Sequence, residues 1–225
     1  MSIVPLLELQ QLQCVRDERV LFTGIDYMIN SGDIVQIEGP NGSGKTTLLR
    51  TLIQLFPHDE GQMLWQGHPV SHVRYDFLSD LLFIGHLPGV KKTLTSRENL
   101  NFLANLQGYY TAEQVDEALV QVGLYGYEEV IGYQLSAGQS RRIALARLYL
   151  TQARLWILDE PYTALDAQGI GKLEMLFIQH VEQGGAVIFT SHQPSNLSNV
   201  KRLSLLDYRP QASHYEMQEE GVDDY

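Results

Sequence analysis

The chain has 225 residues, of which 44% are hydrophobic and 19% are charged, so it can bury one substantial core and is too apolar to be intrinsically disordered. Acidic residues outnumber basic residues 27 to 16, and the net charge of −11 argues against a protein that holds nucleic acid on a broad basic face. We interpret residues 209–225 as a solvated acidic tail, because five acids fall in the last ten positions: Glu216, Glu219, Glu220, Asp223 and Asp224.

A single cysteine, Cys14, cannot form an internal disulfide, and such cysteine usage is typical of a reducing compartment. Residues 1–12 lack the basic start of a signal peptide. No apolar run reaches the roughly 18–20 residues that a membrane span needs. We therefore expect a soluble protein of the cytoplasm.

Short apolar runs alternate with longer amphipathic ones, which is the pattern of an α/β domain with a parallel sheet. The runs at 155–158 and 186–190 are apolar throughout, so we place them in the sheet centre, covered on both faces. The predicted strands span residues 6–13, 34–38, 63–66, 81–84, 155–158, 186–190 and 202–206.

Two helices in the middle of the chain are predicted from their first residues. A threonine is followed three positions later by Glu or Gln at 95–98 and at 111–114, which is the spacing of a capping box. We expect these helices to end at Gly108 and Gly123. Because strand signals are scarce between about 86 and 138, this stretch is predicted to be a helical lobe inserted into the domain.

A glycine-rich segment follows the strand predicted at 34–38. It fits the phosphate-binding pattern G-x-x-x-x-G-K-[ST], in which backbone N–H groups and a helix N-terminus surround phosphates. Lys45 is placed to charge-pair with the β and γ phosphates, and Thr46 to ligate Mg²⁺ through its hydroxyl. The pattern predicts an ATP and Mg²⁺ site that contains Gly39, Pro40, Asn41, Gly42, Ser43, Gly44, Lys45, Thr46 and Thr47.

The apolar run at 155–158 ends in two acids, Asp159 and Glu160. Alone, such a pair would indicate solvated side chains at a strand end. Beside a phosphate loop, Asp159 is placed to hold Mg²⁺ and Glu160 to orient the attacking water. His192 follows the next buried run and can hydrogen-bond the γ phosphate. We therefore predict catalytic roles for Glu160, His192 and Lys45.

Residues 135–139, which read Leu-Ser-Ala-Gly-Gln, resemble the signature motif of ABC-type ATPases. Residues 162–166 resemble the D-loop of that family, and His192 matches its switch histidine. The resemblance implies a P-loop fold of the ABC type, with a mostly parallel core sheet, an N-terminal antiparallel β part and the inserted helical lobe, over residues 1–208. It also implies a homodimer with ATP at the interface, where Ser136, Gly138, Gln139 and Asp166 contact the nucleotide of the other protomer.

Two positions depart from the family pattern. His86 stands where the Q-loop glutamine is usual, and Arg16 stands where an aromatic residue usually stacks on adenine. We keep both in the predicted nucleotide site, since a neutral histidine can accept a hydrogen bond and a guanidinium plane can stack on a base. Arg141 and Arg142, which follow the signature, are interpreted as a solvated helix face.

Segments at 16–19, 64–67, 84–86, 154–161 and 192–194 are similar to the ATPases of c-type cytochrome maturation. This resemblance implies a haem-transporting type of ATP hydrolase on the cytoplasmic face of a bacterial inner membrane. Its partners would be membrane-spanning subunits of a haem-handling complex, and hydrolysis would drive haem delivery or release of a haem-loaded periplasmic chaperone.

Two other functions remain open: the ATPase subunit of a transporter with unrelated cargo, and a soluble ABC-type ATPase acting on nucleic acid or ribosomes. The second usually has two such domains or a coiled-coil insertion, and this chain shows neither, so we expect no nucleic-acid partner. We also expect no direct haem binding. Pro69 lies between His68 and His72 and disfavours a shared helical face that would hold a metal or haem.

Overall fold

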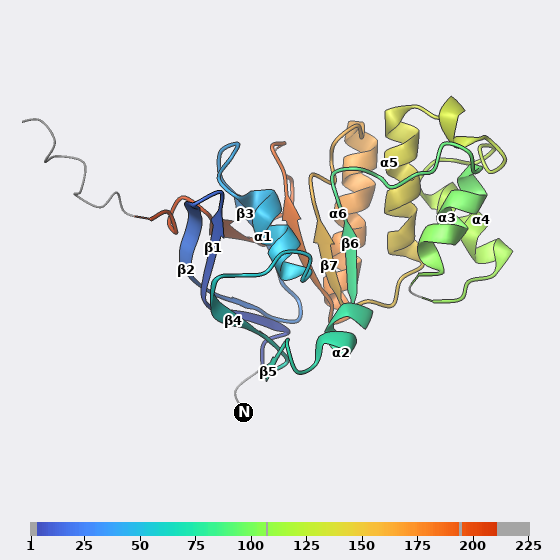
Figure 1. Ribbon diagram of the computed structural model, residues 1–225. Helices are drawn as coiled ribbons and strands as arrows, with labels where there is room; N and C mark the ends of the chain where they lie inside the picture. Colours follow the sequence, from blue (N-terminus) through green and yellow to red (C-terminus); the bar gives the residue numbers. More distant parts are fainter. Residues whose placement is uncertain (1–3, 107, 194, 211–225) are drawn as a thin grey trace, which may run out of the picture.

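The computed structural model describes residues 4–106, 108–193 and 195–210 (Figure 1). The predicted acidic tail, including its five acids, lies outside these residues from 211 onward. None of the helices in the three described stretches is both long and apolar enough to cross a membrane.

Two sheets form the body of the protein (Figure 1). An antiparallel sheet has the order β2-β1-β4-β5, and a parallel sheet has the order β6-β7-β8-β3-β9. These two sheets and the helical lobe confirm the predicted fold class. The antiparallel strands are β1 (Leu7–Arg16), β2 (Arg19–Ile29), β4 (Glu60–Trp65) and β5 (His68–Pro69). The parallel strands are β3 (Ile34–Glu38), β6 (Leu81–Ile84), β7 (Leu155–Leu158), β8 (Ala186–Thr190) and β9 (Val200–Ser204).

The predicted bounds of β3, β6, β7 and β8 agree with the structure, whereas those of the other strands do not. Strand β9 begins at residue 200 rather than 202, β4 at 60 rather than 63, and β1 continues to residue 16. Strands β2 and β5 were not predicted. Every residue of β7 is buried, whereas only Phe22, Ile25 and Ile29 of β2 are buried. Strand β2 also pairs with β1 through register shifts, so its apolar pattern is irregular.

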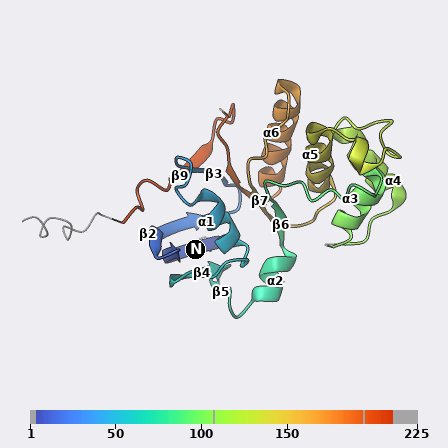
Figure 2. The ribbon, with the colours of Figure 1, turned by 45° about the horizontal axis from the view of Figure 1, so that its top comes forward.

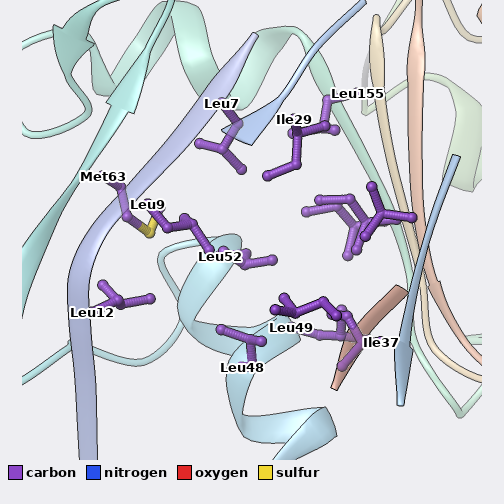
Figure 3. Close-up of a cluster of buried hydrophobic side chains, with 14 of the residues drawn as sticks. Leu7, Leu9, Leu12, Ile29, Ile37, Leu48, Leu49, Leu52, Met63 and Leu155 are labelled. Atoms are coloured by element: carbon purple, nitrogen blue, oxygen red, sulfur yellow. The ribbon is translucent and has the colours of Figure 1, made fainter. Parts of the chain in front are cut away.

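Helix α1 (Lys45–Leu52) packs between the two sheets, and its leucines join both. Figure 3 shows Leu48, Leu49 and Leu52 directed toward Ile37 of β3 and Leu9 of β1. These side chains are at most 1% exposed, and burying each stabilises the fold by about 1.5–3 kcal/mol. The packing therefore fixes the first residues of α1 at the carboxyl end of β3.

A second hydrophobic cluster lies between β7, β8 and helix α6 (Ala167–Glu182). Within it, the buried Glu174 carboxylate accepts hydrogen bonds from the Tyr162 hydroxyl at 3.3 Å, the Ser195 hydroxyl at 2.9 Å and the Asn196 N–H at 3.0 Å. One carboxylate thus holds α6, the segment after β7 and the segment after β8 together.

The helical lobe contains α3 (Ser96–Ala104) and α4 (Ala112–Gln121), while α2 (Arg74–Ser79) precedes β6. Figures 1 and 2 show α3 and α4 gathered with α5 (Ala137–Ala146) on the far side of β6 from the antiparallel sheet. Both predicted capping boxes are present. Helix α4 ends before Gly123, which has φ +75°, as expected. The predicted end at Gly108 is wrong, because α3 stops at Ala104 and is capped by Asn105.

Helix α5 belongs to two hydrophobic clusters. Ile143 and Ala146 pack with α3 and α4 in the lobe, whereas Ala144 and Leu145 pack in the cluster that contains β7. Short 3₁₀ turns lie on either side of α5, at Gly132–Gln134 and Arg147–Tyr149. Helix α5 therefore joins the lobe to the parallel sheet.

Asn99 of α3 fixes the loop that leads from β6 into the lobe. Its side chain is fully buried, accepts a hydrogen bond from the Lys91 N–H at 2.7 Å, and donates to the carbonyls of Lys91, Leu94 and Thr95 at 2.9–3.0 Å. The amide alone therefore satisfies four backbone groups of this loop.

Asn99→Asp should lower the free energy of unfolding by about 2–4 kcal/mol, because an isosteric carboxylate would face three carbonyl oxygens without a donor. Chemical denaturation measures this change. Asn101→Asp is the matched control on the exposed side of α3, where the oxygen that accepts from Asn105 is retained, and its effect should stay within about 0.5 kcal/mol. Equal effects of the two variants would contradict this role of Asn99.

Candidate functional site

A cleft of ≈ 990 Å³ opens where β3, β7 and β8 end. Ile37 of β3 pairs with Thr190 of β8, and Leu158 of β7 pairs with Phe189, so the residues that follow these strands meet at one edge of the sheet. The predicted site residues that line this cleft are Arg16, Pro40, Asn41, Gly42, Gly44, Lys45, Thr46, Thr47, His86, Asp159, Glu160 and His192.

The phosphate loop has the backbone and the donors that an anion requires. A Cβ atom on Gly39, where φ is +155°, would lie 2.5 Å from the Ser43 hydroxyl oxygen, so this position needs glycine. The Ser43 hydroxyl is buried and has no hydrogen-bond partner among the described residues. The Lys45 ammonium donates to two carbonyls of the loop itself, those of Gly39 at 2.6 Å and Pro40 at 3.2 Å. This donor set fits a polyphosphate.

Asp159 connects the phosphate loop to the neighbouring strand. Its carboxylate is 4% exposed and accepts hydrogen bonds from the Thr190 hydroxyl at 2.8 Å and the Thr46 hydroxyl at 3.3 Å. The described residues hold no cluster of three or more His, Cys, Asp or Glu side chains suited to a metal. The Asp159 carboxylate and the Thr46 hydroxyl fit Mg²⁺, which binds through few protein oxygens and completes its shell with phosphate oxygens and water.

Glu160 and His192 also line the cleft and lie against each other. The His192 Nε2 is 3.4 Å from one carboxylate oxygen of Glu160, and the His192 backbone N–H donates to the other at 3.2 Å. The Glu160 N–H donates to the Thr190 hydroxyl at 2.9 Å. Glu160 has φ +52°, a left-handed conformation that is strained for a residue with a side chain.

Thr190 is a site residue that the sequence reasoning missed. Its hydroxyl donates to Asp159 and accepts from the backbone of Glu160, so it orients both acids. The signal was present, because Thr190 is the polar last residue of an otherwise apolar strand.

Arg16 also lines this cleft, and so does Phe56, with which it is in contact. Its guanidinium stands 5.1 Å from the centre of the Phe56 ring, and the Arg50 guanidinium stands 5.4 Å from that ring. Arg16 also donates to the Pro57 carbonyl at 2.9 Å. The ring and this carbonyl hold the guanidinium plane at the cleft, and no sequence pattern indicated Phe56.

The signature residues lie outside this cleft. Ser136 is the N-cap of α5 and forms a capping box with Gln139, whose side chain accepts from the Ser136 N–H at 2.8 Å. Asp166 caps α6 by accepting from the Gly169 N–H at 2.8 Å, and it pairs with Arg142 at 3.5 Å. Ser136, Gly138, Gln139 and Asp166 thus line no part of the phosphate cleft within their own chain.

The interpretation of Arg141 as part of a solvated face is wrong. Its side chain is 4% exposed and donates to backbone carbonyls at the end of β7 and in the loop after β6. Burial lowers the pKa of Arg141, and the charges of Asp159 and Glu160 oppose that shift. Arg142, the next residue, is only partly buried.

Known proteins resemble this chain over most of its length. Residues 22–163 match the model of the family described as ABC transporter. The "Cytochrome c biogenesis ATP-binding export protein CcmA" of Shigella flexneri is 52% identical over 206 residues, which cover 91% of this chain and 98% of that protein. The protein of the same name from Escherichia coli (strain K12) has the same identity and coverage.

Solved structures agree with the fold. A putative ABC transporter ATP-binding protein from Pyrococcus furiosus is 27% identical, with a TM-score of 0.78 over 91% of this chain and 99% of that one. An ATP-binding cassette solved as a dimer bound to ADP and Pi is 23% identical, with a TM-score of 0.73 over 83% of this chain and 88% of that one. The chain therefore belongs to the ABC transporter family, and within it to the group that contains the CcmA proteins.

Proposed function

We propose that this chain is the ATPase subunit of a membrane complex of c-type cytochrome biogenesis. The observation that carries this proposal is the 52% identity to CcmA proteins along nearly the whole chain, combined with an intact phosphate cleft. In this proposal, hydrolysis drives haem delivery or release of a haem-loaded periplasmic chaperone. The chain acts peripherally on the cytoplasmic face of the inner membrane, against membrane-spanning subunits.

The residues at the strand ends divide the chemistry among them. When nucleotide binds, Lys45 exchanges the carbonyls of its own loop for phosphate oxygens, and the buried Ser43 hydroxyl gains an acceptor. Thr46 and Asp159 would hold Mg²⁺, which neutralises phosphate charge when it is bound. Glu160 orients the attacking water, and His192, which already contacts Glu160, hydrogen-bonds the γ phosphate.

The site is complete only when two chains meet. Ser136 and Gly138 stand at the N-terminal end of α5, where free N–H groups and the helix dipole favour an anion, yet they line no part of their own chain's cleft. We therefore place them, with Gln139 and Asp166, against the ATP of a second copy. A related cassette solved as a dimer with ADP and Pi supports this arrangement.

Glu160→Gln should retain ATP and Mg²⁺ binding but lower the hydrolysis rate on the order of 10²-fold or more, since the water loses its orienting carboxylate while the phosphate donors remain. A phosphate-release assay and equilibrium nucleotide binding measure the two effects. Glu182→Gln, at the exposed end of α6, is the matched control and should hydrolyse ATP at the wild-type rate. A wild-type rate for Glu160→Gln would remove Glu160 from the catalytic assignment.

Glu160→Gln with ATP and Mg²⁺ should form a dimer that the nucleotide-free protein does not form, measured by size-exclusion chromatography with light scattering. Adding Ser136→Asp should prevent it, because aspartate still caps α5 but repels the γ phosphate of the other protomer. Thr111→Asp is the control, the same exchange at the N-cap of α4, and should leave the dimer intact. Dimers that persist with Ser136→Asp would contradict the placement of the signature.

Lys45→Ala in the cell should abolish mature c-type cytochromes and leave b-type haem proteins intact, because a chain that cannot hold the γ phosphate cannot drive the haem-handling step. Haem staining of membrane proteins, with visible spectra of the same membranes, makes the measurement. Lys172→Ala, at an exposed position of α6, should behave as wild type. Normal c-type bands with Lys45→Ala would favour a transporter of unrelated cargo.

A further inference from the structure

We propose that Arg141 is a positioning residue for ATP hydrolysis: its guanidinium clamps the end of β7, which carries Glu160, and the loop after β6, which carries His86, to the signature helix α5. This inference rests on the proposed function of Glu160. It gives α5 a second role, in the cleft of its own chain, in addition to the role of Ser136 at the cleft of the partner.

The guanidinium serves two pairs of carbonyls with its two terminal nitrogens. The Arg141 Nη2 donates to the carbonyls of Asp159 at 2.8 Å and Glu160 at 2.9 Å, and Nη1 donates to those of Gly85 at 2.6 Å and His86 at 3.4 Å. The planar fork fixes the distance between these two groups of carbonyls. The buried Nε has no partner among the described residues, so the terminal nitrogens provide all the hydrogen bonds.

Glu160 needs such a clamp because its backbone is strained. A left-handed φ of +52° costs on the order of 1–3 kcal/mol for a residue other than glycine, and it persists only where the surroundings fix it. The Thr190 hydroxyl holds the Glu160 N–H, and Arg141 holds the Glu160 carbonyl. Both peptide groups that flank its Cα are therefore pinned, which directs the carboxylate toward His192.

Arg147 is a control residue, because it is a second arginine whose Nε is buried and its substitution separates an effect on stability from an effect on hydrolysis. It lies in the 3₁₀ turn after α5, donates to the Phe83 carbonyl at 3.2 Å, and, like Arg141, has a buried Nε without a partner among the described residues. Burial lowers the pKa of both arginines. Arg147 donates within β6, to its penultimate residue, and not to the residues that follow β7, which include Glu160.

Arg141→Met should lower kcat for ATP hydrolysis about 10-fold or more, while KM and the Kd of a fluorescent ATP analogue change by less than about 2-fold, because the phosphate loop is untouched. Arg147→Met should lower the melting temperature comparably but leave kcat of the folded protein unchanged. Arg141→Lys keeps the charge and loses the fork, so its kcat should lie between those of wild type and Arg141→Met. If Arg141→Met fails to fold, Arg141→Lys provides the test in its place.

The decisive measurement is the double variant Arg141→Met with Glu160→Gln. If Arg141 acts through Glu160, adding Arg141→Met to Glu160→Gln should change the residual hydrolysis rate by less than about 3-fold, since the effects of residues that act as a unit are not additive. Multiplicative losses would overturn the inference, and so would an equal loss of kcat in Arg147→Met. The Glu160→Gln variant alone tests the proposed function, so failures of the two ideas are distinguishable.

Discussion

The buried carboxylate of Asp159 is the point at which the elements of the cleft are held together. Asp159 directly follows β7 and accepts hydrogen bonds from the hydroxyls of Thr46 on α1 and Thr190 on β8, so one side chain connects three elements that are distant in sequence. The parallel register makes this possible, because β3, β7 and β8 end at one edge of the sheet. The leucines of α1 then hold the phosphate loop at that edge. The position of Glu160 is fixed by Asp159, which precedes it in the chain.

The sequence patterns predicted two kinds of element: strands that are apolar at every position, and helices whose first residues cap them locally. Strands β7 and β8 are buried at every position and have continuous apolar runs, and the lobe helices begin with capping boxes formed within four residues. Strand β2 was missed because its burial alternates irregularly and its pairing with β1 shifts register. The end of α3 was predicted too late, at Gly108, because the helix is capped by Asn105 and not by a glycine.

The unpredicted parts of the site depend on contacts between distant segments. Arg141 binds carbonyls that lie 18, 19, 55 and 56 positions away, and nothing in a basic helical stretch distinguishes an arginine that faces carbonyls from one that faces water. Phe56 likewise meets Arg16 only because the segment after α1 returns to β1. The motif residues that do line the cleft were predictable because the chemistry of phosphate binding restricts their types and spacing.

Helix α5 gives a physical reason why pairing of two chains and hydrolysis depend on each other in the proposed mechanism. Ser136 at its first turn is exposed, whereas Arg141, five residues later, is buried against the carbonyls of Asp159 and Glu160. Because α5 packs both with the lobe and with the cluster around β7, a displacement of its N-terminus is transmitted to the whole helix. In the proposed mechanism, a phosphate bound at Ser136 stabilises one placement of Arg141, and through Arg141 one geometry of Glu160. By linkage, that geometry of Glu160 in turn favours the paired state.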